Sequence, residues 1–222
     1  MMDIMEAMQK RHSVRAYEEK PLSAEHRTAL LEKIAELNEE SGLHIQLVTD
    51  EPKAFSSLLA HYGSFSGVTN YVAMVGEKSE KTDELCGYYG EKLVLFAQQI
   101  GLNTCWVKST YKKVPEAFEI CKGEELVIVI SIGYGKNQGK PHKSKSAEAV
   151  AKDYGTAPEW FRKGVDAALI APTAVNQQKF SFVSDGNKVK AKAGIGPCRS
   201  IDLGIVKYHF ELGAGKENFT WA

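Results

Sequence analysis

The sequence predicts an α+β fold in which two half-repeats share one core. Three observations support this prediction. Segments with helical periodicity alternate with segments of strand-like apolar pattern along the whole chain. The run "ELVIVISIGYG", residues 125–135, is the most apolar segment and is typical of a central strand covered on both faces. A helix followed by a strand and a turn occurs twice, at residues 30–50 and 165–185.

Composition limits the class of protein. The chain has 222 residues, 43% hydrophobic and 25% charged, which suits one soluble domain or a compact pair of subdomains. Lys plus Arg equals Asp plus Glu at 28 each, so no basic field favours a nucleic-acid partner. The longest apolar run, Leu126–Ile132, is too short to span a bilayer, and we expect no membrane association.

Cysteine and histidine usage indicates a reduced, cytoplasmic protein without a metal site. The four cysteines form no CxxC pair, and the six histidines form no HExxH pattern. Structural roles are therefore expected for these residues.

The first part of the chain contains most of the predicted elements. Ser23 is a suitable N-cap, and Gly101 is a suitable residue to follow a helix end. We expect helices at Met2–Lys10, Ala24–Leu37, Phe55–His61, Leu85–Ile100 and Val114–Cys121, and strands at Leu43–Asp50, Tyr71–Gly76, Leu102–Val107 and Glu125–Gly135.

A basic connector, residues 136–146, is the only internal boundary that the sequence suggests. It divides the chain into residues 1–140 and a shorter half, 141–222, within one integrated core. In the second half, Thr156-Ala-Pro-Glu159 has the pattern of a capping box before a helix at Ala157–Ile170. A hairpin at Phe180–Ala191 and a final helix at Asp202–Leu212 follow.

The repeat extends to a second pair of segments. "GEKLVLFAQQIGLNTCW" and "GIVKYHFELGAGKENFTW" share the spacing between two glycines and a closing tryptophan. The matched pairs are Gly90 with Gly204, Phe96 with Phe210, Gly101 with Gly215 and Trp106 with Trp221. Coincidence between two amphipathic helices is the alternative. A true repeat predicts halves that superpose about a pseudo-two-fold axis.

Two polar segments carry the candidate chemistry. Arg11, Ser13 and Arg15 alternate in "RHSVR", so an extended backbone points all three side chains the same way. Two guanidinium groups and a hydroxyl form either an anion receptor or a solvated basic turn. The cluster Asn176–Gln178 is either a hydrogen-bonding wall for a planar ligand or a polar turn. No P-loop or GxSxG motif is present, which favours chemistry carried by a bound cofactor.

Taken together, Arg11–Arg15, "AQQIGLNTCWV" at Ala97–Val107 and "APTAVNQQKF" at Ala171–Phe180 resemble the FMN-dependent nitroreductase family. The resemblance covers nearly the whole chain. It implies a nitroreductase-like fold, with a central, mostly antiparallel sheet flanked by helices.

The resemblance also implies the residues of an FMN site. Arg11 and Ser13 would take the ribityl chain and phosphate, Arg15 would lie near flavin N1 and O2, and the segment after the Gly-Leu turn would direct a backbone N–H toward N5. Either Lys143 or Lys145 would reach the phosphate. The full expected set is Arg11, His12, Ser13, Arg15, Gly67, Asn70, Val107, Lys108, Ser109, Lys143, Lys145, Pro172, Thr173, Ala174, Asn176 and Gln177.

The sequence departs from the family pattern at five residues and in the order of its motifs. His12 replaces a common arginine, Lys179 a proline and Phe180 a tryptophan, while Lys108 and Ser109 stand where glycines are usual. The Pro-Ser-Ser-x-Asn-x-Gln motif, matched by residues 172–178, also lies in the second half rather than early in the chain. We therefore expect a pseudo-dimer, monomeric or weakly homodimeric, with one FMN per chain.

The activity implied by the resemblance is ping-pong reduction of a small-molecule acceptor, such as a nitroaromatic or quinone, by NADH or NADPH. Three alternatives are another flavin chemistry on the same fold, a flavin-binding or redox-sensing protein without turnover, and a protein that binds no flavin.

Overall fold

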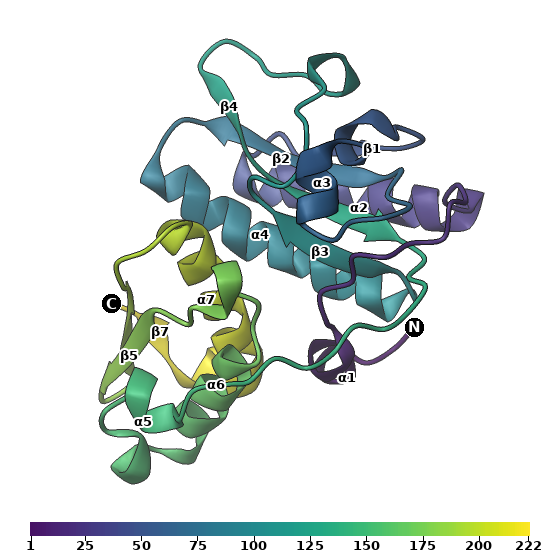
Figure 1. Cartoon of the computed structure of the whole chain (residues 1–222). Coiled ribbons are helices and arrows are strands. Elements are labelled where there is room, and N and C mark those ends of the chain that lie inside the picture. Colours follow the sequence, from purple (N-terminus) through teal and green to yellow (C-terminus); the bar gives the residue numbers. More distant parts are fainter. The chain divides into compact units, whose positions relative to one another are not determined.

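The chain forms two compact units (Figure 1). This computed structural model describes the backbone of residues 1–222 and all side chains except that of Leu59. Unit 1 comprises Met1–Thr82 and Leu93–Pro141, and unit 2 comprises Asp83–Lys92 and His142–Ala222. Residues 83–92, which the sequence-based division left in the first part, thus belong to unit 2.

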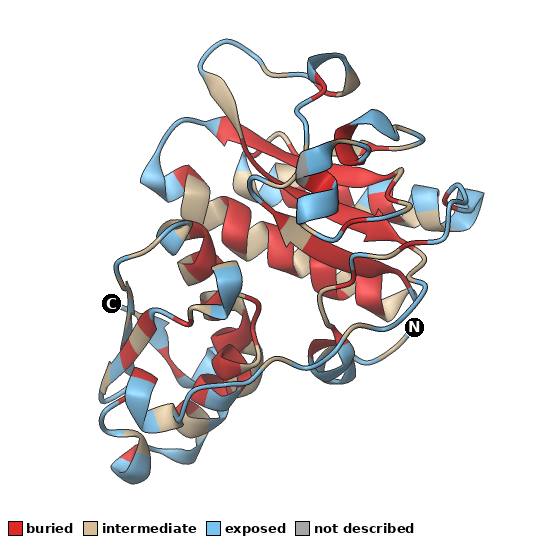
Figure 2. Cartoon of the chain, viewed as in Figure 1, coloured by how far each residue is buried: buried red, intermediate tan, exposed pale blue. Residues whose placement is uncertain are grey.

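Unit 1 contains a four-stranded sheet. Its strands are β1 (Gln46–Val48), β2 (Tyr71–Glu77), β3 (Asn103–Val107) and β4 (Glu124–Gly133), in the order β1-β2-β4-β3. Every pairing is antiparallel, as the resemblance implies. The prediction of a central apolar strand is confirmed, because β4 is an inner strand and is buried from Val127 to Gly133 (Figure 2).

The helices of unit 1 begin where polar side chains cap them. Asp3 caps α1 (Ile4–Lys10), and Ser23 caps α2 (Ala24–Ser41) by accepting from His26 N at 3.2 Å. Helix α2 ends at Gly42, whose φ of 72° is favourable for glycine. The remaining elements are the 3₁₀ turns η1 (Lys53–Phe55) and η2 (Pro115–Ala117), the helix α3 (Leu58–Tyr62), and residues 80–82 and 93–99 of α4 (Glu80–Gln99).

Two predictions for unit 1 are wrong. The helix expected at Val114–Cys121 is only the turn η2, and Phe118 is already extended, with φ −152° and ψ 160°. The carboxamide of Gln46 donates to Glu119 O and accepts from Glu119 N, both at 2.8 Å, so this backbone bonds to a distant side chain. The strand expected at Leu43–Asp50 is shortened to Gln46–Val48, since Asp50 turns with φ 56°.

Unit 2 combines helices with a three-stranded sheet. The helices are α5 (Ala147–Val150), α6 (Glu159–Leu169), α7 (Arg199–Ala214) and residues 83–92 of α4. The strands β5 (Phe180–Asp185), β6 (Lys188–Ala193) and β7 (Thr220–Trp221) lie in that order, with β5 antiparallel and β7 parallel to β6. Short 3₁₀ turns occur at η3 (Tyr154–Thr156), η4 (Ala174–Asn176) and η5 (Lys216–Asn218).

The expected capping box of α6 does not form. The N-cap residue is Pro158, without a side-chain cap, and the Thr156 hydroxyl instead donates to Asp153 O at 3.2 Å. Residues 154–156 are in the turn η3, which directs Thr156 away from the helix start.

Glycines allow the helices of unit 2 to pack closely. A Cβ on Gly87 of α4 would lie 2.0 Å from Ile201 O of α7, and one on Gly204 of α7 would lie 1.9 Å from Glu84 O of α4. The two backbones therefore touch at a reciprocal glycine crossing. The aromatic core beside it includes Phe182 stacked on Phe210, with ring centroids 4.6 Å apart.

The proposed repeat stays a prediction. The first half has the order α2-β1-α3-β2-α4-β3, and the second has α6-β5-β6-α7-β7, which matches it except that no helix corresponds to α3. The sheets differ, however, because β4 separates β2 from β3, whereas β7 pairs directly with β6. Separately, no helix in the described part of the chain is long and apolar enough to cross a membrane.

A buried polar pair joins α4 to α7 within unit 2. Both Glu91 and His209 are fully buried, and His209 Nε2 lies 2.9 Å from Glu91 Oε1. The other ring nitrogen, Nδ1, lies 3.1 Å from Ala167 O, which can only accept. Nδ1–H therefore donates to this carbonyl, and Nε2 faces the carboxylate.

We predict that His209→Leu lowers the free energy of unfolding by about 3–5 kcal/mol, because Glu91 would stay buried without its imidazole partner. Glu91→Gln retains a polar group opposite Nε2 and should cost about 1 kcal/mol. Glu84→Gln is the matched control. Glu84 of α4 pairs with Lys207 of α7 at 2.7 Å, so this pair joins the same two helices, but both side chains are partly exposed. Its cost should be below about 1 kcal/mol. Urea unfolding measures all three, and equal costs for His209→Leu and Glu84→Gln would contradict the prediction.

Candidate functional site

The segment Arg11–Tyr17 lies along the edge of the unit 1 sheet, and we call it the edge segment. Val14 N donates to Thr104 O of β3 at 3.0 Å, and Ser13 forms a parallel bridge with Thr104. Val14 and Tyr17 are buried in the hydrophobic cluster of this unit. The apolar side chains therefore anchor the edge segment, and its extended backbone sets the direction of the residues between them.

Arg11, Ser13 and Arg15 all influence the thiol of Cys105 of β3. Burial raises the pKa of the Cys105 thiol, whereas the Arg15 charge, a hydrogen bond with Ser13 and the Arg11 charge lower it. Arg11 is only 4% exposed, while Arg15 is exposed, with its guanidinium carbon 6.0 Å from the centroid of the Phe65 ring. The structure thus brings together the three side chains expected to bind an anion.

Residues 63–67 lie directly against the edge segment. Ser66 N donates to Arg15 O at 3.0 Å, and Tyr17 N donates to Ser66 O at 2.9 Å. Gly67 has φ 67°, and a Cβ there would lie 2.2 Å from Tyr17 O. A larger residue at this expected site position would push the loop away from the edge segment.

The bend after β3 contains the next group of expected residues. Val107 is buried in the core, whereas Lys108 and Ser109 are exposed. The Lys108 ammonium group donates to Val127 O of β4. Its side chain therefore holds the bend against the sheet, and the expected contribution of a backbone N–H from this bend stays a prediction.

Two expected residues have structural contacts in unit 1. The buried Asn70 carboxamide accepts from Asp50 N at 3.2 Å and donates to Thr69 Oγ1 at 3.1 Å, so it stabilises the turn after β1. His12 Nδ1 lies 3.2 Å from Gln138 O. Sequence reasoning missed Asn103, whose carboxamide donates to Gln138 Oε1 at 3.0 Å and accepts from Gly135 N at 3.0 Å.

The carboxamides near Asn176, in unit 2, bind the connector. Asn176 Nδ2 and Gln178 Nε2 both donate to Lys143 O, at 3.0 and 2.9 Å. Gln178 Oε1 accepts from Lys145 N, and the Lys145 ammonium group donates to Gln178 O, both at 2.9 Å. These are the hydrogen bonds of a polar turn. They also distinguish the two candidate lysines, because Lys145 uses its ammonium group here while Lys143 contributes its carbonyl.

The turn formed by residues 172–178 has strained backbone geometry. Val175, Asn176 and Gln178 have φ values of 47°, 53° and 46°, which non-glycine residues rarely adopt. Each costs on the order of 1–3 kcal/mol, and such residues cluster at functional sites. This turn therefore has three strained residues within four positions. The Val175 side chain is exposed.

Asp202 of α7 holds the strained turn, and sequence reasoning missed it. Its Oδ1 accepts from Ala174 N at 2.9 Å, and its Oδ2 accepts from Gln177 Nε2 at 2.7 Å. Thr173 Oγ1 accepts from Gln178 N at 3.1 Å and closes the turn from within. One signal in the sequence could have identified it. Asp202 lies next to Ile201 and near Ile205 in a predicted helix, and a carboxylate among apolar side chains is unusual.

Burial raises the pKa of Asp202 from 3.8 to about 6, although hydrogen bonds from Gln177 and the Ala174 N–H act in the opposite direction. The side chain is 5% exposed, so desolvation of the carboxylate dominates. Asp202 therefore changes from protonated to ionised just below neutral pH. The hydrogen bonds from Ala174 N and Gln177 Nε2 favour the ionised form.

Comparison with known proteins gives consistent results. A model of the family described as "Putative TM nitroreductase" matches residues 3–214. A solved "putative nitroreductase" of Thermotoga maritima is 22% identical, with TM-score 0.69, covering 97% of this chain and 85% of that one. No curated protein matches.

Two further structures are described as complexes with FMN. The protein of Desulfovibrio desulfuricans is 18% identical, with TM-score 0.53, covering 68% of this chain and 96% of that one. The protein of Exiguobacterium sibiricum is 16% identical, with TM-score 0.51, covering 67% of this chain and 96% of that one. At these identities, the three structures show a shared fold.

We predict that Asp202→Asn changes the pH dependence of stability. Because the pKa in the fold lies above 3.8, protonation of Asp202 favours the folded state. Its contribution is fully present below that value and is lost as the pH rises through about 6. The free energy of unfolding of the wild type, relative to Asp202→Asn, should therefore fall by up to about 3 kcal/mol between about pH 4 and pH 7. Asp185→Asn, at an exposed turn, is the control, and parallel profiles for all three proteins in urea unfolding would refute the prediction.

Proposed function

We propose that this chain, which belongs to the nitroreductase family whose model spans residues 3–214, is an FMN-dependent oxidoreductase. The observation that carries the proposal is the position of the edge segment, with Arg11, Ser13 and Arg15, along β3, where Val14 N donates to Thr104 O at 3.0 Å. FMN in the structures from Desulfovibrio desulfuricans and Exiguobacterium sibiricum supports the choice of ligand.

The donors of the edge segment fit a phosphate-bearing ligand. Residues 11–17 and 63–67 include two arginines and several hydroxyl groups, and they include no carboxylate. Arginine presents a planar, permanently charged fork that matches phosphate oxygens. Arg11 would bind the phosphate together with Ser13, and burial of Arg11 limits the entropy lost on binding.

Arg15 would stabilise charge on the ligand rather than hold the ligand in place. Its exposed guanidinium group can stabilise negative charge that develops on a ligand beside the edge segment. When bound, FMN supplies the redox chemistry, and the chain supplies binding, orientation and electrostatics. We further propose NADH or NADPH as the donor and a nitroaromatic, quinone or similar small molecule as the acceptor, following the family resemblance.

A flavin-binding or redox-sensing protein without turnover is the second candidate. The observation favouring it is that Lys108 and Ser109 replace the usual glycines, and that Lys108 is tied to Val127 O. Steady-state oxidation of NADH or NADPH in the presence of menadione or a nitrofuran separates the candidates. Multiple turnovers per flavin are expected, and a flavin-loaded protein that oxidises neither nucleotide would reject the enzymatic proposal.

We predict that Arg11→Ala weakens FMN binding roughly tenfold or more, since one charge-assisted contact is worth about 1.5–3 kcal/mol. Fluorescence titration of FMN into the flavin-free chain measures the dissociation constant. Arg27→Ala is the control, because Arg27 is an exposed cation of α2 in the same unit. Arg15→Ala removes an exposed guanidinium group and so tests the edge segment without disturbing a buried side chain. Unchanged affinity in both Arg11→Ala and Arg15→Ala would remove the edge segment from the FMN site.

A further inference from the structure

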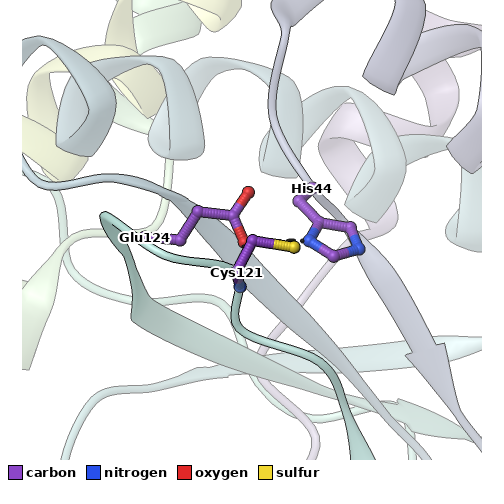
Figure 3. A group of neighbouring side chains, drawn as sticks. All are labelled: His44, Cys121 and Glu124. Atoms are coloured by element: carbon purple, nitrogen blue, oxygen red, sulfur yellow. Dashed lines mark hydrogen bonds and ion pairs between the residues drawn. The ribbon is translucent and has the colours of Figure 1, made fainter.

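Three potential metal ligands meet beside β1 and β4 in unit 1 (Figure 3). One ligand atom from each of His44, Cys121 and Glu124 lies within 4.8 Å of the others. The His44 ring and the Glu124 carboxylate are directly linked, with Nδ1 3.0 Å from Oε2. These residues are distinct from the edge segment.

A tight turn places the Cys121 and Glu124 side chains together. Glu124 N donates to Cys121 O at 3.1 Å, and Gly123 occupies the third position with φ 92°. A type II turn requires a positive φ at that position, which glycine adopts without strain. Cys121 N then donates to Glu124 Oε2 at 2.7 Å, so the turn itself orients the carboxylate.

The third ligand is fixed by the sheet. His44 N donates to Val75 O of β2 at 2.9 Å, which holds the histidine backbone beside the start of β4. Two residues later, Gln46 binds both backbone groups of Glu119 at 2.8 Å. The Gln46 carboxamide therefore clamps the loop that carries Cys121 against the segment that carries His44.

The charges around the cluster favour a cation. Glu124 Oε2 accepts from Cys121 N at 2.7 Å and lies 3.0 Å from His44 Nδ1, so this carboxylate faces both other ligands. A second carboxylate is near, since Glu119 Oε1 lies 3.8 Å from Cys121 Sγ.

We propose that His44, Cys121 and Glu124 form a zinc site, with water as the fourth ligand. One nitrogen, one sulfur and one oxygen donor are the ligand types that Zn²⁺ binds in tetrahedral geometry. Ligand atoms around one zinc lie about 3.3–3.8 Å apart, given bonds of about 2.0–2.3 Å. The ligand atoms here lie within 4.8 Å of one another, and the exposed Cys121 side chain would have to turn toward the other two when zinc binds.

The direct test is calorimetric titration of ZnCl₂ into the full-length chain after treatment with a chelator. We expect one Zn²⁺ per chain, with release of about one proton because the thiol ionises on binding. Proton release is obtained from titrations in two buffers of different ionisation enthalpy. Cys121→Ser, Glu124→Gln and His44→Gln should each weaken binding at least about tenfold. Gln46→Ala should weaken it roughly tenfold while leaving all three ligands in place.

Cys198→Ser is the matched control, because Cys198 is a partly buried cysteine of unit 2 outside the cluster. Its zinc affinity should equal that of the wild type. Thermal unfolding in the absence of metal shows whether each variant is folded. Co²⁺ gives an independent signal, since a thiolate–cobalt absorption band should appear in the wild type and be lost in Cys121→Ser. The proposal is overturned if Zn²⁺ does not bind, or if folded Cys121→Ser binds it as tightly as the wild type.

Discussion

The hydrogen bond from Val14 N to Thr104 O determines where the positive charge of the N-terminal segment lies. It fixes the extended segment on the edge of β3, and burial of Val14 opposes a shift by one residue. Such a shift would exchange the two faces of the segment. With the observed register, the charges of Arg11 and Arg15 both lower the pKa of the Cys105 thiol, and the anion receptor that we propose is built on this segment.

In unit 2, a buried carboxylate has the corresponding organising role. Residues 172–178 adopt left-handed backbone angles that are unfavourable without support, and Asp202 supplies it through two hydrogen bonds. The cost of burying this carboxylate appears as its raised pKa. The turn and the carboxylate therefore stabilise each other at the expense of desolvation.

Elements governed by local periodicity could be predicted from the sequence. The apolar pattern of residues 125–135 identified the inner strand β4, and Ser23 identified the start of α2. The α+β class and the antiparallel sheet of unit 1 were also predicted correctly. In these segments, local preference and tertiary packing favour the same structure.

The failures occurred where distant residues determine the local structure. Gln46 binds the Glu119 backbone across 73 residues, which prevents the helix expected at Val114–Cys121. The same contact positions Cys121 near His44, so cysteine spacing alone could not suggest a metal site. Asp202 was missed for a similar reason, because its partners lie on another segment and its sequence context is an ordinary helix.

The central claim is that this chain is a flavoprotein, and the content of bound flavin tests it most directly. The full-length protein would be saturated with FMN, freed of excess by gel filtration and scanned in the visible range, after which the flavin would be released by denaturation and quantified. The account predicts a yellow protein that retains one FMN per polypeptide. A colourless protein after saturation would contradict flavin binding, and two FMN per polypeptide would contradict the single site expected of a pseudo-dimer.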